Sequence, residues 1–497
     1  MPERSDPRST PALPIPAEWR RVLERQAELE KEVERLRREN ERLRRELEKA
    51  LRAAKRQAAP FARPAPKDHP RKPGRKPGCH YGRAHWRPLP EEIEETLEAS
   101  LPARCPDCGG AVEVERIAEQ YQTEWPPIRP RHLRFRVAVG RCRQCGTRLQ
   151  GRHRQQTSDA LGVAASQLGP QAVAGAVWLV KGLGLSHEKA RAVLEQLGGL
   201  GVSRSGLCRA IARAGRKAEP TYQQLVQIVR RTPVVSPDET GWKVAGRLWW
   251  AWVFATSEVT VYAIQPGRGF AQAAAVLGEG FDGFLVRDGW SVYRQFAQAV
   301  HQTCLAHLLR RCRERIQIVG GRGAQFPRAI QTLLQSSLDL RDRRDRGQIS
   351  PHGLAVARGK LEARLDRVLD RRTRSPANRR LQNHLWRERE ALFPFLYCPG
   401  LEATNWRAEQ AIRPLVVARK VWGGNRTPAG ARTQQILCSV LRTCWQQGRS
   451  PLSTLCELLC GPLPQAIPML GCDLSPPHSS HYPLTSPHPP AALAAVA

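Results

Sequence analysis

The chain has 497 residues, long enough for several domains. Lysine and arginine total 79 against 46 aspartate and glutamate residues, a formal net charge of +33. This excess favours a polyanionic partner, with nucleic acid as the first candidate and an anionic membrane surface as the alternative. Fourteen cysteines in a chain of this length exclude a small disulfide scaffold and are typical of reduced thiols in a cytoplasm.

The sequence favours neither export nor membrane insertion. The opening MPERSDPRST has charges and prolines where a signal peptide would have its apolar core. The stretch Leu161–Val180 is rich in apolar residues, but it contains Ser166, Gln167, Pro170 and Gln171. We therefore expect a buried helix there and not a membrane span.

The N-terminal segment carries the signature of a coiled coil. Residues 1–17 are polar and proline-rich and are expected to be disordered. Residues 18–56 lack proline and glycine, and apolar or asparagine side chains recur there at alternating steps of four and three: Leu29, Val33, Leu36, Asn40, Leu43 and Leu47. One asparagine in such a seam favours a parallel two-stranded register. We predict a homodimer through residues 18–56, with a single charged helix as the alternative.

A basic linker follows over residues 57–99. Much of it is a run of proline, glycine, lysine and arginine, FARPAPKDHPRKPGRKPGCHYGRAHWRP. Such a segment can follow a DNA groove, as minor-groove arms do, or it can be a solvated spacer. The sequence leaves both interpretations open.

Residues 100–150 carry two metal-binding turns, Cys105-Pro-Asp-Cys108-Gly and Cys142-Arg-Gln-Cys145-Gly. Each turn can place two thiolates on one Zn²⁺, and the two pairs together make a closed four-cysteine site, which is structural. Glycine after each pair allows the backbone to fold over the metal. The gap between the pairs is longer than in common zinc fingers, as expected for a ribbon with an inserted hairpin. Redox cysteines or plain core thiols are the alternative.

Residues 160–220 are predicted to be helical and to contact DNA. Three helices are expected, over Ala172–Leu183, His187–Leu197 and Ser203–Ala214. The third carries basic residues and resembles the second half of a helix-turn-helix. An ordinary helical spacer is the alternative. The DNA-binding candidates in this helix are Arg204, Arg209 and Arg213.

The next segment has strand signals and two aspartates. We predict strands over a hydrophobic run ending at Asp238 and over Leu248–Phe254, Val259–Ile264 and Phe284–Val286, with a helix over Gly269–Leu277. Asp238 and Asp288 are then each expected at a strand end, where both side chains reach one crevice. Carboxylates there are candidate Mg²⁺ ligands, although an aspartate after a strand is more often a turn residue.

A helical insertion is predicted over residues 308–400. Before it we expect a helix over Trp290–Val300 and a short strand over His301–Cys304. Cys304 and His307 have the spacing of a metal pair, but the sequence shows no nearby residue that clearly completes a tetrahedral set. We therefore expect them to have a structural role.

The last predicted helix runs from Asn405 to Val417. It presents Asn405, Glu409 and Arg413 on one face, and Pro414 is expected to kink it or end its regular part. Residues 448–497 are rich in proline, serine, histidine and alanine and are expected to be mostly disordered.

Four motifs, DETGW, LVRDGW, HQTCLAH and TNWRAEQAIRPLVVARK, occur here in the order found in bacterial insertion-sequence transposases of the IS-sixty-six (IS66) type. The chain resembles that family over roughly residues 20–447. The resemblance implies an RNase H-like catalytic domain over residues 230–447 and a DDE triad of Asp238, Asp288 and Glu409. Glu239 and Asp282 are then neighbours without a metal ligand's role. Gln410 stands where the family usually has arginine.

The resemblance also implies cofactors and partners. Two Mg²⁺ or Mn²⁺ ions are expected at the triad, and Zn²⁺ at the four cysteines. DNA is the expected partner, both element ends and target, with Arg413 and Lys420 as further DNA contacts. We expect a cytoplasmic, nucleoid-associated bacterial protein without membrane contact, and accessory proteins of the same element are conceivable partners.

Together these features predict a multidomain protein. Its α/β RNase H-like core has an all-helical insertion and is preceded by a coiled coil, a zinc ribbon and a helix-turn-helix region. The predicted function is that of a DNA transposase, which binds element ends and catalyses metal-dependent strand cleavage and strand transfer. The alternatives are an RNase H-like nuclease without strand transfer and an inactive DNA-binding protein derived from a transposase.

Overall fold

The computed structural model describes residues 25–26, 28–43, 89–123, 128–162, 167–460, 464 and 466–469. The chain divides into two compact units, Met1–Gln122 and Thr123–Ala497, and each is described by itself. The predictions for residues 1–17, for the linker before residue 89 and for the tail beyond residue 469 lie outside the described residues. Among those that are described, no helix combines the length and apolar character needed to cross a membrane.

The first unit contains a helix and an extended segment. Residues 28–43 are helical, and the seam positions among them are exposed: Leu29, Val33, Leu36, Asn40 and Leu43. Leu47 lies outside the described residues. Residues 89–122 have no helix or strand. Within the described residues of the first unit, this apolar helical stripe is therefore exposed.

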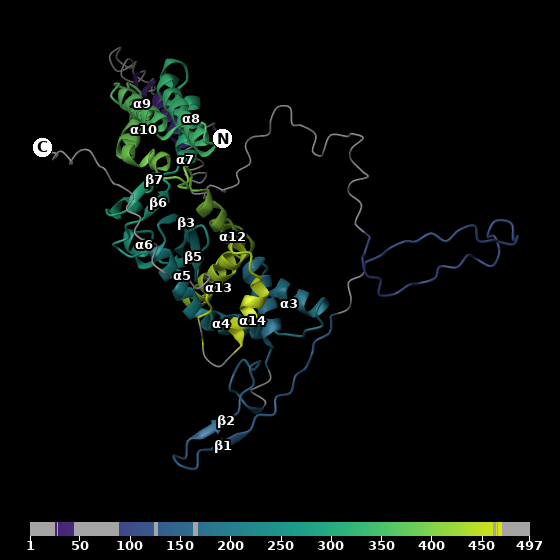
Figure 1. Ribbon diagram of the computed structural model, residues 1–497. Coiled ribbons are helices and arrows are strands. Elements are labelled where there is room, and N and C mark those ends of the chain that lie inside the picture. Colours follow the sequence, from purple (N-terminus) through teal and green to yellow (C-terminus); the bar gives the residue numbers. More distant parts are fainter. Residues whose placement is uncertain are drawn as a thin grey trace, which may run out of the picture. The chain divides into compact units, whose positions relative to one another are not determined.

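A five-stranded sheet forms the centre of the second unit, in the order β5-β4-β3-β6-β7. Figure 1 labels four of its strands, β3, β5, β6 and β7, among the helices of this unit. Antiparallel neighbours are β3 (Val234–Val244), β4 (Arg247–Ala255) and β5 (Thr260–Gln265). Next to β3 lie the parallel strands β6 (Phe284–Arg287) and β7 (Val300–Thr303). All five predicted strand segments are strands.

The predicted end of the first core strand is wrong. Asp238 lies inside β3, which continues to Val244. The reason is a tight hairpin: Ala245 and Gly246 both have positive φ, as a two-residue turn between antiparallel strands requires. The strand continues because Trp242 and Val244 bury their side chains.

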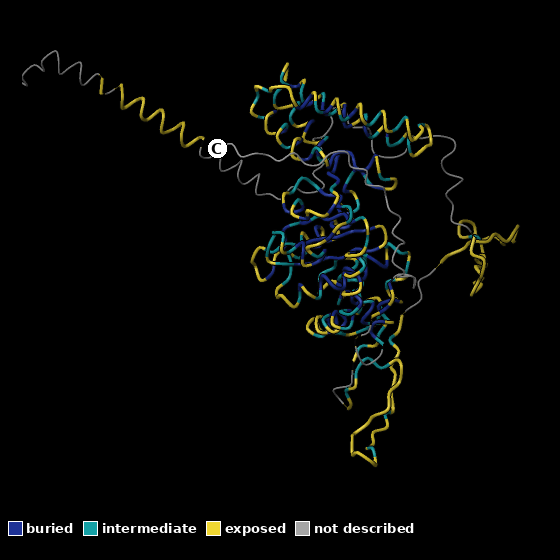
Figure 2. The backbone as a smooth tube through the Cα atoms, turned by 60° about the vertical axis from the view of Figure 1, so that its left-hand side comes forward, coloured by how far each residue is buried: buried dark blue, intermediate teal, exposed yellow. Residues whose placement is uncertain are grey.

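Successive side chains of β4 point to opposite faces of the sheet and so belong to different core clusters. Trp252 and Phe254 belong to a cluster with α5 (Glu219–Arg231) and α6 (Phe270–Leu277), the helix predicted there. Val253, between them, belongs to a cluster with α12 (Trp406–Trp422). Figure 2 shows the buried residues concentrated along these strands and the helices that face them.

The edge strand β5 is covered by α13 (Pro428–Gln446). Side chains spaced one helical turn apart on α13 accept hydrogen bonds from alternate backbone N–H groups of β5. The pairs are Gln435 with Ile264, Ser439 with Tyr262, and Thr443 with Thr260, at 3.0, 2.9 and 3.2 Å. This ladder occupies N–H groups that would otherwise template pairing with another strand.

The helices before the sheet share its core. They are α2 (Pro170–Val177), which continues into a π-helical turn over Trp178–Gly182, α3 (His187–Gln196) and α4 (Arg204–Lys217). Leu207 of α4 and Val235 of β3 belong to one hydrophobic cluster. The expected boundary between residues 220 and 230 is therefore not a boundary between separate cores.

Part of the segment expected to be disordered is folded. Residues Pro451–Leu459 form α14, which packs on α2 and α4 and buries Leu455 and Leu458. Leucines spaced three apart outweigh the polar, proline-rich composition that surrounds them, because they complete an apolar helical face.

The residues between β7 and α12 form helices around a separate hydrophobic cluster. The helices are α7 (Leu305–Val319), α8 (Gln325–Asp345), α9 (Pro351–Leu369), α10 (Pro376–Arg387) and α11 (Pro394–Tyr397). The helix expected over Trp290–Val300 is reduced to a 3₁₀ turn, Ser291–Gln295. Pro414 does not end α12, which extends to Trp422.

Candidate active site

Asp238 points toward the face of the sheet that α12 covers. It lies opposite Val253 in the antiparallel register, and opposed residues project to the same face. Val253 packs in the cluster that includes residues of α12. Glu239 lies opposite Trp252 and so projects to the other face.

Asp288 directly follows β6, as predicted from the sequence. Strands β3 and β6 run parallel, with Val235 paired to Leu285. Extending this register by three residues brings Asp238 level with Asp288. The backbone N–H of Trp290 donates to Asp288 Oδ1 at 2.9 Å, which fixes the orientation of this carboxylate.

Glu409 lies in the first turn of α12, and its side chain is 43 % exposed. The start of this helix is tied to β3, because Asn405 Nδ2 donates to the carbonyl oxygen of Pro237 at 2.8 Å. Pro237 directly precedes Asp238. Glu409 and Arg413 are exposed, whereas Asn405, which was predicted to share one helical face with them, is buried. Asn405 serves as the anchor of the helix.

Burial and nearby negative charges act on the carboxyl group of Asp238. Burial raises the pKa of Asp238 well above its usual range, and the negative charges of Glu239, Asp288 and Glu409 raise it further. A divalent cation bound between these groups would neutralise their negative charges. Carboxylate oxygens are the hard donors that Mg²⁺ takes, so this donor set fits the divalent ions expected from the sequence.

Glu239 forms a buried network that sequence reasoning missed. Its Oε1 accepts from Arg268 at 2.6 and 2.9 Å, and its Oε2 accepts from the Tyr293 hydroxyl at 2.5 Å. The Arg268 guanidinium lies over the rings of Trp250 and Trp290, at 4.6 and 3.8 Å. Because the N–H of Trp290 holds the second aspartate, the network supports the loop after β6.

A second buried group anchors β6 to the helical insertion. Arg287 Nη1 lies 2.7 Å from Glu388 Oε2, and Arg294 Nη1 lies 2.8 Å from Glu388 Oε1. Glu388 is fully buried and follows α10. No local pattern reveals this pair, because 101 residues separate its members.

The structure gives Cys304 and His307 a third potential ligand, Glu409. Cys304 directly precedes α7, and His307 lies in that helix's first turn. A ligand atom of each of the three residues lies within 4.8 Å of the other two. The third potential donor comes from α12, more than 100 residues away in the sequence, so the sequence alone did not reveal it.

The predicted DNA contacts lie on exposed helical faces. Ser203 caps α4 by accepting from the N–H of Gly206 at 3.0 Å. The opposite face of α4 is buried in the core, whereas its basic face is solvent-exposed. The exposed candidates on α4 and α12 are Arg204, Arg209, Arg213, Arg413 and Lys420.

The two Cys-x-x-Cys turns have the same backbone form. The N–H of Gly109 donates to Cys105 O at 2.9 Å, and the N–H of Gly146 donates to Cys142 O at 3.0 Å. The second turn joins strands β1 (Val139–Arg141) and β2 (Arg148–Gln150). The first turn, with Cys105 and Cys108, belongs to the other unit.

Local hydrogen bonds favour thiolates in both turns. The Thr147 hydroxyl and then its backbone N–H lower the pKa of Cys145 to about 7. Backbone N–H groups of Asp107 and Cys108 lower the pKa of Cys105. Thiolates are the form that binds metal.

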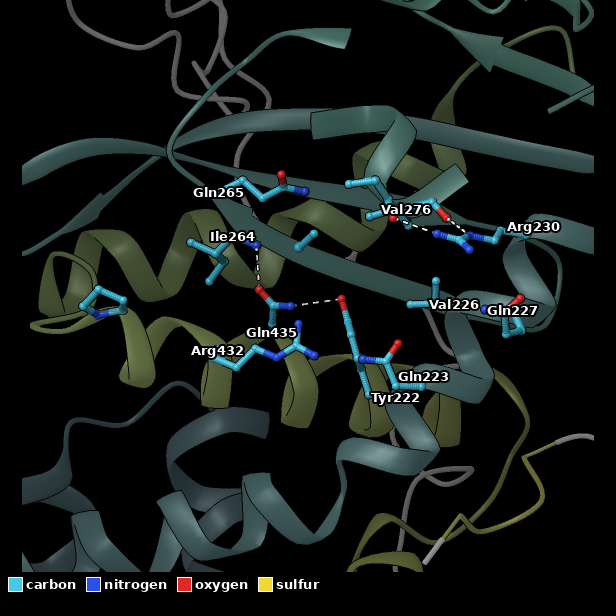
Figure 3. Close-up of a pocket in the computed structure, with 13 residues that line it drawn as sticks. Tyr222, Gln223, Val226, Gln227, Arg230, Ile264, Gln265, Val276, Arg432 and Gln435 are labelled. Atoms are coloured by element: carbon cyan, nitrogen blue, oxygen red, sulfur yellow. Dashed lines mark hydrogen bonds between the residues drawn. The ribbon is translucent and has the colours of Figure 1, made fainter. Parts of the chain in front are cut away.

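A separate pocket of about 450 Å³ lies between α5, β5 and α13 (Figure 3). Gln435 reaches across it from α13, accepting from Ile264 N and donating to the Tyr222 hydroxyl at 3.0 Å each. None of the predicted site residues lines it. The carboxylate cluster therefore remains the candidate active site.

The chain is similar to known proteins over about half of its length. A protein of Sinorhizobium fredii (strain NBRC 101917 / NGR234), named "Uncharacterized protein y4qI", is 25 % identical over 292 residues, which are 52 % of this chain and 53 % of the relative. The chain thus spans about half the length of the curated relative it matches. The family model described as "Transposase IS66 family" matches residues 165–433, just over half of the chain, including all three carboxylates and the helices of the 160–220 region. The chain therefore belongs to the IS66 transposase family.

Proposed function

We propose that the protein is a DNA transposase that cuts and joins DNA strands with a metal-dependent DDE triad of Asp238, Asp288 and Glu409. The family assignment supports a transposase-type activity. The sheet, an antiparallel meander followed by two parallel strands, supports an RNase H-like core.

The observation that carries the proposal is the convergence of three carboxylates from separate elements. Asp238 faces α12, the strand register brings Asp288 level with it, and the Asn405 anchor joins the start of α12 to β3. The negative charges of Asp288 and Glu409 raise the pKa of Asp238, which supports the same convergence.

Some residues of the site would bind the metal ions, and others hold those ligands in position. Asp238, Asp288 and Glu409 would hold two divalent ions, and Asp238 must lose its proton to take part. When bound, such ions activate water or a 3′-hydroxyl and stabilise the leaving oxygen. Trp290 holds Asp288 in one orientation through its backbone N–H, and Asn405 holds the start of α12 against β3. Fixed ligands spare the reaction the cost of arranging them.

Other features supply binding and assembly. The exposed arginines of α4 are proposed to contact element ends in a helix-turn-helix-like manner, and the net charge of +33 to attract DNA non-specifically. The exposed stripe of residues 28–43 is proposed to pair with a second copy. The two Cys-x-x-Cys turns are proposed to share one structural Zn²⁺.

Purified protein, Mg²⁺ or Mn²⁺ and labelled element-end DNA test the proposal directly. A transposase gives joined products on target DNA. Cut ends without joining identify an RNase H-like nuclease, and binding without cleavage identifies an inactive derivative, so either result would contradict strand transfer.

A further inference from the structure

Cys304, His307 and Glu409 form a group of mixed donors beside the carboxylate cluster. The thiol comes from the residue that precedes α7, the imidazole from the first turn of α7, and the carboxylate from the first turn of α12. Their ligand atoms lie within 4.8 Å of one another. Sulfur, nitrogen and oxygen donors at this spacing suit a thiophilic divalent ion better than Mg²⁺, which takes oxygen.

The separation between His307 and Glu409 suits two donors that share one ion. Nδ1 of His307 lies 3.6 Å from Glu409 Oε1, beyond hydrogen-bond range. That nitrogen atom is buried and has no hydrogen-bond partner among the described residues. Tetrahedral zinc with bonds of about 2.0–2.2 Å to nitrogen and oxygen separates those two donors by roughly 3.3–3.6 Å. The observed gap therefore matches an edge of a coordination tetrahedron.

Backbone contacts hold the thiol in place. The N–H of Asn405 donates to Cys304 Sγ at 3.2 Å, and the N–H of Cys304 donates to Arg287 O at 2.7 Å. A backbone donor to sulfur stabilises the negative charge that a thiolate ligand carries. Asn405 is also the residue that anchors α12, so the thiol and the carboxylate are positioned by one contact region.

We propose that Cys304, His307 and Glu409 bind one thiophilic divalent cation of the zinc class, with a fourth position open to water. We further propose that this ion inhibits strand cleavage, because it occupies the carboxylate of Glu409 that the Mg²⁺ site requires; this second step rests on the proposed function. Zinc would then lower activity reversibly, and a chelator that leaves Mg²⁺ bound would restore it.

The metal site is tested on full-length protein without DNA. Zinc content after saturation and dialysis should be one ion per chain lower in Cys304→Ser than in the wild type. Titration with Co²⁺ should give a thiolate-to-metal absorption band in the wild type that exceeds the band of Cys304→Ser. The two Cys-x-x-Cys turns are present in both proteins, so their contribution cancels in the difference.

Cys312→Ser is the matched control. Cys312 is a buried thiol of α7, about two turns beyond Cys304, and lies among apolar neighbours. Its replacement should therefore leave the ion count unchanged. His307→Gln alters a part-exposed residue and should also lose the ion, which guards against misfolding of one variant. Equal zinc content and equal Co²⁺ spectra in wild type and Cys304→Ser would overturn the site.

Activity measurements separate this proposal from the general one. With wild-type protein in Mg²⁺, added zinc should reduce cleavage at least tenfold, and Cys304→Ser should need more than ten times as much zinc for the same effect. Equal zinc sensitivity of the two proteins would overturn the inhibitory role. A protein that binds the extra ion but never cleaves DNA would contradict the proposed function and still support the metal site.

Discussion

Removing the carboxylate of Glu388 should destabilise the catalytic unit severely. Glu388 neutralises Arg287, whose side chain is 2 % exposed, and also contacts Arg294, which is 33 % exposed. In Glu388→Ala the Arg287 guanidinium stays buried without a counter-charge. Breaking a buried pair in this way costs about 3–5 kcal/mol, because the remaining charge has lost both its water and its partner.

Asp366→Ala provides the matched comparison. Asp366 pairs with Arg389 through two bonds of 2.6 Å in the same helical insertion, but the two side chains are 33 % and 40 % exposed. Solvent screens this pair, so its loss should cost less than about 1 kcal/mol.

Urea unfolding followed by tryptophan fluorescence measures both variants against the wild type. The reasoning predicts that Glu388→Ala loses several times more unfolding free energy than Asp366→Ala. The double variant Glu388→Met with Arg287→Met should recover most of the loss, since no charge is then left buried. Equal costs for the two single variants would refute the role assigned to burial.

Three further predictions concern charge, DNA recognition and assembly. Because burial and neighbouring carboxylates raise the pKa of Asp238, its charged form costs stability above the usual aspartate range near 4. Without divalent metal, Asp238→Asn should therefore have a higher Tm than the wild type at pH 7, with the gap closing as pH falls; a lower Tm at pH 7 contradicts this sign. Arg209→Glu should weaken binding to element ends about tenfold more than binding to random DNA. The control Arg371→Glu makes an equal charge change on an exposed loop and should weaken binding to both DNAs equally. Equal losses of affinity for both DNAs in Arg209→Glu would mean that α4 contacts only phosphates. Deleting residues 18–56 should reduce a dimer to a monomer in light scattering, and an unchanged oligomeric state would exclude the coiled coil as the dimer contact.

Local sequence patterns predicted most elements of the second unit. Alternating and β-branched runs marked the strands, because a half-buried strand repeats every two residues. The spacing of Asn405 and Glu409 placed both at the start of one helix, and the structure shows the N–H of Glu409 donating to Asn405 O at 3.1 Å. The two aspartates meet because parallel neighbours β3 and β6 bring them to the same level of the sheet.

The site contacts that sequence patterns did not predict join residues that are far apart in the chain. Glu239 was expected to be a neighbour without a metal role, and its orientation to the other face agrees with that. However, it is ion-paired with Arg268, 29 residues away, so it is not a neutral site for substitution. The third donor beside Cys304 and His307 was missed for the same reason: only the fold brings the start of α12 to the start of α7.

Polar residues in the sequence obscured the full length of β3 and the presence of α14. Asp238 is charged and is predicted to end a strand, but the strand continues because Trp242 is buried beyond it. The residues of α14 lie in a proline-rich context, and their apolar face becomes visible only against α2 and α4.

The central claim is that three carboxylates form one catalytic unit, and strand cleavage by three single variants tests it most directly. Asp238→Asn, Asp288→Asn and Glu409→Gln keep the shape of each side chain and remove one metal-binding charge. Each should reduce cleavage and joining of element-end DNA by at least about 10³-fold, and combining them should add little further loss, because the residues act as a unit. DNA affinity should stay within about twofold, since the chain's positive charge supplies it.

Two control variants are measured in the same cleavage assay. Asp282 is exposed and lies before β6, so Asp282→Asn should keep wild-type activity. Glu402 precedes α12, and its Oε1 lies 3.7 Å from Arg407 Nη2. It is the alternative carboxylate for the third position of the triad. The account predicts that Glu402→Gln cleaves DNA while Glu409→Gln does not; full activity in Glu409→Gln, with loss in Glu402→Gln, would contradict the triad.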